Sequence, residues 1–379
     1  MSKPRFIASF ADVEMLLREK AGWGALAQSA LEPNPFYEAD FLAAAERHLE
    51  RGARLRLLVV RDVADNALAG LLPLRKPRLR EGILFDALSL YANEYSSLST
   101  PLIRADGAAA ILDAAFRFLA GKHGIPQVLH FGKLAGSRPF HALLQAHAQA
   151  ARLPVLMVTH HDRAAIETRL TVEAYRALES ASTRKSLNRK QKHLEAHGTL
   201  AFSTIPGDAP DALAAFLALE ASGWKGRHGT ALASRPETRA FAEAALGASA
   251  GQPCLFFECL SLDGRPIAMN LNLRSQDAAF TLKTAYDEAF AAYSPGALLD
   301  RWSVTLVAAG HLTRFDSCAD PGHRIEAIWH EQERIATLLV GVSEAISGEQ
   351  LEPIAARMQL ATGLIDRAKA LRARFAGTA

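Results

Sequence analysis

Cysteine, long apolar runs and targeting signals are scarce in this chain of 379 residues. Its three cysteines are Cys254, Cys259 and Cys318, none in a CxxC pair, and an odd count argues against a disulfide framework. We expect all three to be small buried side chains in a reducing compartment. No apolar run is long enough to span a bilayer, and the N-terminal MSKPR lacks the apolar segment of a signal peptide. The sequence therefore predicts a cytoplasmic protein with no membrane span and no metal.

The chain also lacks a large excess of charge of either sign. The 43 Lys and Arg residues nearly balance the 40 Asp and Glu residues, leaving a net charge of +3. Such a balance does not indicate a general nucleic-acid binder, so DNA is excluded as a partner and only local basic patches matter. The length exceeds that of one typical core, which makes two domains the default.

One pattern of elements occurs twice along the chain, and we interpret it as a structural duplication. The first half has predicted helices at 36–50 and 108–121 and strands at 54–61, 67–75, 83–90, 98–103 and 126–132. The second has predicted helices at 209–222, 235–249 and 294–310 and strands at 254–262, 266–274, 278–286 and 312–316. After residue 324 we expect helices again, the last at 351–375. The predicted domains are 1–162, on the acceptor side, and 163–379.

The most basic segment of the chain lies between the two halves. Residues 184–193 read RKSLNRKQKH within a predicted helix at 172–197. Lys185 and Arg189 are four residues apart, so cations line one side of that helix. The segment is either a solvated helix face or a cationic surface for an anionic cofactor or substrate.

The clearest local signal is the step Ser294-Pro295-Gly296. Ser294 suits the N-cap of a helix, Pro295 suits its first position, and Gly310 falls where a left-handed C-cap belongs. A helix N-terminus carries free N–H groups, and a glycine there permits close approach, so a phosphate or pyrophosphate would fit. The alternative is an ordinary well-capped helix.

Three segments carry a family resemblance. Residues 219–231 (LEASGWKGRHGTA), 284–296 (TAYDEAFAAYSPG) and 314–316 (RFD) resemble the CelD-like branch of the GNAT acyltransferases. This branch is associated with cellulose and exopolysaccharide gene clusters and is related to the Fem-type aminoacyl transferases. The likeness covers about 170–340, including the basic segment; over 1–160 it rests on the order of elements.

The resemblance implies an α/β (α+β) fold with two tandem GNAT-like domains, each a mixed, mostly antiparallel sheet flanked by helices. It implies acetyl-CoA or another acyl-CoA as co-substrate, with its pantetheine arm between strands 278–286 and 312–316. The residues expected to bind it are Ser294, Gly296, Ala297 and Lys283. The chain departs from the family in a glycine-poor phosphate loop and in residues 316–323, where His323 and Arg324 replace the usual pair.

Transfer of an acyl group from a thioester to an amine requires a neutral amine, a polarised carbonyl and a protonated leaving thiolate. Asp316, at the end of a predicted central strand, is the first candidate base; otherwise it is a turn-forming Asp. Tyr286 lies near the same cleft, and Tyr293 could protonate the thiolate or serve as a packing residue. A covalent role for Cys318 is disfavoured because direct transfer needs no such intermediate.

The acceptor is expected to be a small molecule or a glycan precursor, as in polysaccharide biosynthesis. The candidate substrate-binding residues are Trp224, Lys225, Asn270, Tyr91 and Tyr95, although Trp224 could instead be a buried anchor. One alternative is a Fem-type transferase that uses aminoacyl-tRNA, which the modest net charge disfavours. The other is a non-catalytic scaffold with the same fold. The acyl chain length and the oligomeric state stay open at this stage.

Overall fold

The computed structural model describes residues 4–50, 52–76, 87–122, 124–247 and 255–376. The chain divides into two compact units. Unit 1 comprises residues 1–37, 54–161 and 334–379, and unit 2 comprises 38–53 and 162–333. The division after residue 161 is close to the predicted boundary. However, 38–53 belong to unit 2 and 334–379 to unit 1, each opposite to the predicted assignment.

Unit 1 is built on a mostly antiparallel sheet in the order β1-β2-β3-β4-β6-β13, with β5 beside β3. The one parallel pair that the described ladders of this unit contain is β4 with β6. The strands are β1 (Phe6–Ala11), β2 (Arg56–Asp62), β3 (Leu68–Arg75), β4 (Leu88–Leu90), β5 (Leu102–Ile103) and β6 (Val128–Ala135). Two further strands, β7 (Val155–Ile166) and β13 (Glu331–Gly341), have residues in both units.

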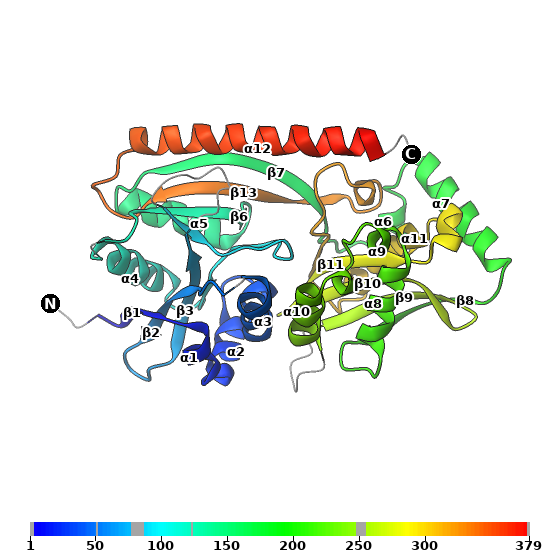
Figure 1. The fold of residues 1–379 in the computed structure, drawn as a ribbon, viewed down its shortest axis with the longest axis horizontal. Helices are drawn as coiled ribbons and strands as arrows, with labels where there is room; N and C mark the ends of the chain where they lie inside the picture. The colour runs from blue at the N-terminus through cyan, green and yellow to red at the C-terminus, as the bar shows by residue number, and fades with distance from the viewer. Residues whose placement is uncertain (1–3, 51, 77–86, 123, 248–254, 377–379) are drawn as a thin grey trace. The chain divides into compact units, whose positions relative to one another are not determined.

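Helices cover both faces of the unit 1 sheet (Figure 1). One face packs against α4 (Ala108–Ala120) and α5 (Pro139–Ala150). The other packs against the long α12 (Gly348–Ala376), whose Leu351 and Ile354 contact β7 and β13 residues in one apolar cluster. The shorter helices of this unit are α1 (Val13–Leu17), α2 (Lys20–Ser29) and η1 (Pro35–Tyr37).

Unit 2 repeats this plan with strands in the order β7-β12-β11-β10-β9-β8. These are β8 (Leu200–Pro206), β9 (Leu255–Leu262), β10 (Arg265–Ser275), β11 (Ala278–Tyr286) and β12 (Arg314–Asp316). β11 pairs with β12 in parallel, and the neighbouring pairs are antiparallel. Asp263 and Gly264, both at positive φ, form the predicted hairpin turn between β9 and β10.

The helices of unit 2 lie on both sides of its sheet. One side carries α6 (Val172–Arg176), α7 (Ala181–Glu195) and α11 (Pro295–Ala308). Phe216 of α8 packs on Phe257 of β9 on the other side, and Phe41 of α3 packs on Phe241 of α10. The remaining bounds are α3 (Ala39–Leu49), α8 (Ala212–Ser222), α9 (Trp224–Arg227), η3 (Leu232–Ser234), α10 (Pro236–Leu246), η4 (Glu288–Tyr293) and η5 (Arg324–Ala327).

Three predictions of secondary structure were wrong, one of them the strand at 98–103, of which only 102–103 form a strand. The helix expected at 172–197 is two helices, α6 and α7, because Ser180 caps a new start by accepting a hydrogen bond from the Thr183 N–H. The helix expected after residue 324 is the strand β13, whose apolar side chains are shared between two faces of the sheet. Residues 83–86 of one predicted strand, and Cys254, lie outside the described residues.

Candidate functional site

The helix α11 starts where the sequence predicts, but the Ser294 side chain does not cap it as expected. Ser294 has φ 51°, in the left-handed region, and its side chain makes no N-cap hydrogen bond. Its hydroxyl instead accepts a hydrogen bond of 2.7 Å from Lys190 Nζ of α7, and its carbonyl accepts one of 3.0 Å from the Ala297 N–H. Gly310 follows the helix with φ 74°, as predicted. The basic helix α7 therefore reaches the N-terminus of α11.

The two strands that flank α11 pair over a short stretch only. Their parallel ladder pairs Ala278 with Arg314 and ends where Phe280 pairs with Asp316. β11 continues to Tyr286 beyond this ladder, whereas β12 ends at Asp316. The second half of β11 therefore extends past the end of β12, and its Thr284 lies beside Gly296 at the start of α11.

A second cation stands at the start of α11. A Cβ added to Gly296 would lie 2.7 Å from Nη2 of Arg324, so the exposed Arg324 guanidinium rests against the helix N-terminus. The N-terminus of a helix carries partial positive charge and attracts anions rather than cations. Lys190 and Arg324 therefore concentrate positive charge where the backbone already favours an anion.

Behind these cations lies a buried polar layer formed by α11, β9, β10 and β11. Glu258 accepts hydrogen bonds from Asn270 Nδ2 at 3.1 Å and Asn272 Nδ2 at 3.0 Å. Thr284 donates to Asn270 Oδ1 at 2.8 Å. Burial raises the pKa of Glu258 to about 7, although its hydrogen bonds oppose the rise. Burial likewise raises the pKa of Asp300 to about 6, against the opposing charge of Arg324. The pKa of each carboxyl is thus closer to neutral pH than that of an exposed carboxyl.

A lysine pair occupies the other side of β11. Lys225 Nζ donates to the Thr284 carbonyl at 2.6 Å and lies 3.6 Å from Oε1 of the buried Glu220. Lys283 Nζ lies 3.6 Å from the same Glu220 oxygen. Burial lowers the pKa of Lys225, and the neighbouring cation Lys283 lowers it further. The structure thus brings together Lys225 and Lys283, two residues singled out from the sequence.

Trp224 lies at the surface with 45% of its area exposed, so it is not the buried anchor that the sequence left open. The backbone N–H of Trp224 donates to Glu288 Oε1 at 2.6 Å, and Arg227 pairs with Oε2 of the same carboxylate at 2.7 Å. These contacts hold the start of α9 against η4.

Asp316 has surroundings that argue against its predicted role as base. The carboxylate is fully buried between Arg163, with ion-pair distances of 2.8 Å, and Arg314 at 2.7 Å. Arg314 also pairs with the buried Glu333 at 2.8 Å. Burial alone would raise the pKa of Asp316, but the two guanidinium charges outweigh it and hold the pKa below its usual value. A carboxylate so paired accepts a proton poorly and serves the architecture of β12.

The predicted tyrosines fall into two groups. Tyr286 and Tyr293 are partly buried and pack against the apolar cluster that includes α11, and the Tyr293 hydroxyl lies 2.7 Å from His197 Nε2. Tyr91 and Tyr95 are buried in unit 1. The Tyr91 hydroxyl accepts a hydrogen bond of 3.0 Å from Asn93. Tyr91 and Tyr95 therefore form part of a packed loop rather than an open substrate surface.

The cysteines of the described chain are free thiols. Cys259 is buried, which raises the pKa of its thiol to about 11, and Cys318 is partly buried. Within the described ranges, no group of three or more His, Cys, Asp or Glu side chains could hold a metal ion. Every helix in those ranges is too short or too polar to cross a membrane.

Comparison with protein families gives one match, and comparison with curated proteins gives none. Residues 181–323 match a family model described as an acetyltransferase (GNAT) domain. A search of curated proteins finds no match.

Solved structures resemble the chain at the level of the fold. A C-terminal domain of a putative lysylphosphatidylglycerol synthetase from Agrobacterium fabrum is 12% identical, with a TM-score of 0.54, and the match covers 90% of this chain and 95% of that one. FemX is 9% identical, with a TM-score of 0.54 and coverage of 88% and 98%. A conserved protein of unknown function from Bacteroides thetaiotaomicron is 13% identical, with a TM-score of 0.51 and coverage of 88% and 100%. The predicted architecture is confirmed as two units whose mostly antiparallel sheets are flanked by helices, with a match to a GNAT domain over residues 181–323.

Sequence reasoning missed three groups at this site. Arg324 was noted only as a departure from the family pattern, and Glu258 and Asp300 were not selected at all. The two carboxyls could have been found from their apolar neighbours: Glu258 lies in LFFECLSL and Asp300 in GALLDRW.

Proposed function

We propose that this protein is an N-acyltransferase that takes its acyl group from acyl-CoA, bound by unit 2. The observation that carries the proposal is the positive charge around Gly296: the helix N-terminus, Lys190 and Arg324. A pyrophosphate carries the opposite charge and accepts hydrogen bonds from N–H groups and cations alike. β11 extends past the end of β12 next to this point, and we place the pantetheine arm along this edge of β11.

The transfer itself is direct. The neutral amine of the acceptor attacks the thioester carbonyl, the carbon–sulfur bond breaks, and the amine proton and the thiolate must be accommodated. We assign the proton acceptor to Asp300, since its charge interacts with Arg324 and its pKa of about 6 leaves it ionised at neutral pH. Tyr293 stays our candidate for protonating the thiolate, and Tyr286 stays a second catalytic candidate. Lys283 stays a candidate for binding the donor. Lys225 and Trp224 stay candidates for the acceptor, which we expect to be a small molecule or glycan precursor.

The donor is tested by calorimetric titration with acetyl-CoA and longer acyl-CoAs. Wild type should bind with micromolar affinity. Replacing Lys190 by Met removes one charge-assisted contact, worth about 1.5–3 kcal/mol, and should weaken binding about tenfold to hundredfold. Lys185→Met removes an exposed charge from the same helix and is the matched control. Equal affinities in all three proteins would remove Lys190 from the donor site, and no binding by wild type would end the proposal.

The role of Asp300 is tested through the pH dependence of the rate. A base must be ionised, so turnover should rise with pH through about 6 and level off above it. Asp300→Asn should lower kcat with little change in acyl-CoA affinity and should remove this rise. A variant with unchanged kcat and an unchanged pH profile would assign the proton to another group.

A Fem-type transferase that uses aminoacyl-tRNA is the second candidate. The fold likeness to FemX over 88% of the chain and the exposed cations of α7 favour it. Affinity for tRNA should then fall steeply with salt, because each phosphate contact releases counterions. The same titrations with charged tRNA in place of acyl-CoA separate the two donors. Binding of neither donor would favour a non-catalytic scaffold.

A further inference from the structure

A partly buried lysine contacts the stretch of β11 that extends past β12. Lys225 Nζ donates at 2.6 Å to the carbonyl of Thr284, which lies beyond Phe280, the last residue of β11 that pairs with β12. The Cγ2 atom of the same Thr284 would lie 3.7 Å from a Cβ added to Gly296 at the start of α11. The amine of Lys225 therefore lies beside the part of β11 on which we place the pantetheine arm of acyl-CoA.

Contacts within unit 2 hold this amine in place. The Lys225 carbonyl accepts hydrogen bonds from the N–H groups of Thr230 at 2.8 Å and Ala231 at 3.1 Å. Its Nζ lies 3.6 Å from Oε1 of Glu220, whose Oε2 accepts a hydrogen bond of 2.8 Å from the Leu232 N–H. The lysine is thus held at its backbone and at its amine, while 21% of its side chain stays exposed to solvent.

The surroundings of Lys225 favour the neutral form of its amine. Burial lowers the pKa of Lys225, against the opposing charge of Glu220. The cations Lys283 and Arg324 lower that pKa further, and Arg324 is the residue whose guanidinium rests against Gly296. A larger fraction of Lys225 than of an exposed lysine is therefore unprotonated at neutral pH, and only an unprotonated amine attacks a carbonyl.

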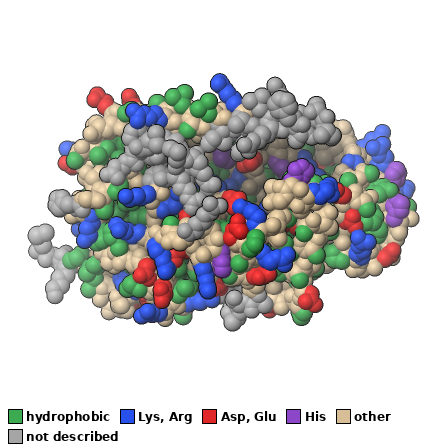
Figure 2. All heavy atoms as spheres, in the orientation of Figure 1, with side chains coloured by type: hydrophobic (Ala, Val, Ile, Leu, Met, Phe, Trp, Pro, Cys, Tyr) green, Lys and Arg blue, Asp and Glu red, His purple; other side chains and the backbone are tan. Residues whose placement is uncertain are grey.

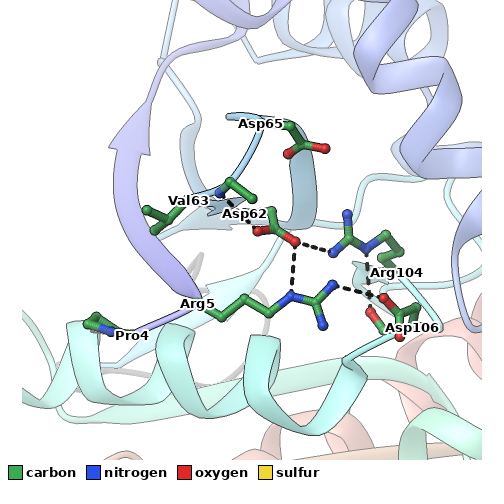
Figure 3. A pocket seen from close by; sticks show the side chains of 8 residues that line it. Pro4, Arg5, Asp62, Val63, Asp65, Arg104 and Asp106 are labelled. Carbon is green, nitrogen blue, oxygen red and sulfur yellow. Dashed lines mark hydrogen bonds and ion pairs between the residues drawn. The ribbon is translucent and has the colours of Figure 1, made fainter. Parts of the chain in front are cut away.

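A hollow of unit 1 shows the contrast (Figure 3). Its wall contains Arg5 and Arg104, which both pair with Asp62, at 3.1 and 2.7 Å. Guanidinium groups stay protonated in proteins, so they do not attack thioesters. No lysine occurs among the residues that the structure describes in this wall, and its cations are therefore limited to ion pairing.

We propose that Lys225 is a self-acylation site, to which the protein transfers the acyl group of its own bound acyl-CoA. The inference rests on the proposed function, because it takes the donor from the site at α11. The neutral amine of Lys225 attacks the thioester carbonyl, a carbon–nitrogen bond forms, and the carbon–sulfur bond breaks. The amine proton passes to the thiolate, which leaves as the thiol of CoA.

The acylated lysine is an end state and not an intermediate. The product is an amide, which is more stable than a thioester and does not pass its acyl group on to another amine. Acylation also removes the positive charge beside Glu220 and enlarges the side chain next to the Thr284 carbonyl. Self-acylation therefore changes the surface that we assign to the acceptor.

The test follows acylation of individual lysines by peptide mass spectrometry after incubation of the full-length protein with acetyl-CoA. Exposed lysines react slowly with any thioester, and Figure 2 shows Lys and Arg side chains spread over one face of the molecule. The exposed Lys122 of unit 1 measures this background. Acylation of Lys225 should saturate with acetyl-CoA and fall when free CoA is added. It should also be roughly tenfold or more faster than acylation of Lys122, because the bound thioester is held beside the amine.

Variants and calorimetry complete the test. Lys225→Arg keeps the charge but offers no amine, so the folded variant should lack one acyl group per chain. Gly296→Val weakens donor binding and should slow acylation of Lys225 about tenfold to hundredfold at limiting acetyl-CoA, with Lys122 unaffected. Lys225 modified no faster than Lys122, in protein that binds acetyl-CoA by calorimetry, would overturn this inference alone. Absence of binding would overturn the proposed function as well.

Discussion

Substitution of Gly296 separates binding from stability. The residue occupies the second position of α11, and a Cβ there would lie 2.7 Å from Arg324 Nη2 and 3.7 Å from Thr284 Cγ2. The tip of an arginine is flexible, so Gly296→Ala requires a shift of roughly 1 Å by Arg324 and little else. Alanine is also favoured over glycine within helices by up to about 1 kcal/mol. Gly296→Ala should therefore fold as well as wild type or better.

Gly296→Val carries the prediction further, because its two γ-carbons occupy the space above the helix N-terminus. A pyrophosphate would then lose at least one hydrogen bond to the backbone or to Arg324. A charge-assisted hydrogen bond is worth about 1.5–3 kcal/mol, so the Kd for acyl-CoA should rise about tenfold to hundredfold. Alanine should cause a smaller loss than valine.

The assay pairs calorimetric titration of acyl-CoA with urea denaturation of each variant. Gly22→Val is the matched control: Gly22 lies near the start of α2, with nothing within 4 Å of an added Cβ. This control should leave the Kd unchanged. Wild-type affinity in folded Gly296→Val would refute the assignment of the anion site to α11.

Three further predictions follow from the same contacts. Asp316→Asn should destabilise unit 2 by about 3–5 kcal/mol, because it removes the carboxylate that pairs with the buried Arg163; a variant of full stability in urea that has lost activity would restore the catalytic role. Glu258 has a folded-state pKa near 7, above that of the unfolded chain, so its contribution to stability falls as pH rises from about 4.5 to 7. Relative to wild type, Glu258→Gln should therefore gain unfolding free energy across that window, and a constant difference would contradict this. The loss of affinity in Lys190→Met should shrink at high salt, since screening already weakens that contact in wild type; a salt-independent loss would mean a change of shape rather than of charge.

Local signals predicted the neighbourhood of the site well. The bounds of β11 agree with the predicted strand at 278–286, and α11 begins at the predicted Pro295. Turn and cap residues act over a few positions, so a single sequence contains their effect. What the sequence could not specify was the hydroxyl of Ser294, which binds Lys190 more than a hundred residues earlier instead of capping its own helix.

Contacts between residues far apart in the sequence account for the other differences between the prediction and the structure. Asp316 was proposed as a base from its place at the end of a predicted central strand, and nothing near it in the sequence reveals Arg163, which lies 153 positions away. The helix expected after residue 324 rested on apolar residues at helical spacing, such as Ile335 and Leu338, but a strand with both faces buried accommodates the same positions. Residues 38–53 belong to unit 2 and residues 334–379 to unit 1, although most of each unit lies far away in the sequence. No change in composition marks this assignment.

A crystal structure of the protein with bound CoA tests the central claim most directly. The account predicts the pyrophosphate at the N-terminus of α11, within hydrogen-bond distance of the Gly296 N–H and of Lys190 or Arg324, and the pantetheine arm between β11 and β12. CoA bound elsewhere, or no CoA in crystals grown at saturating concentration, would contradict it.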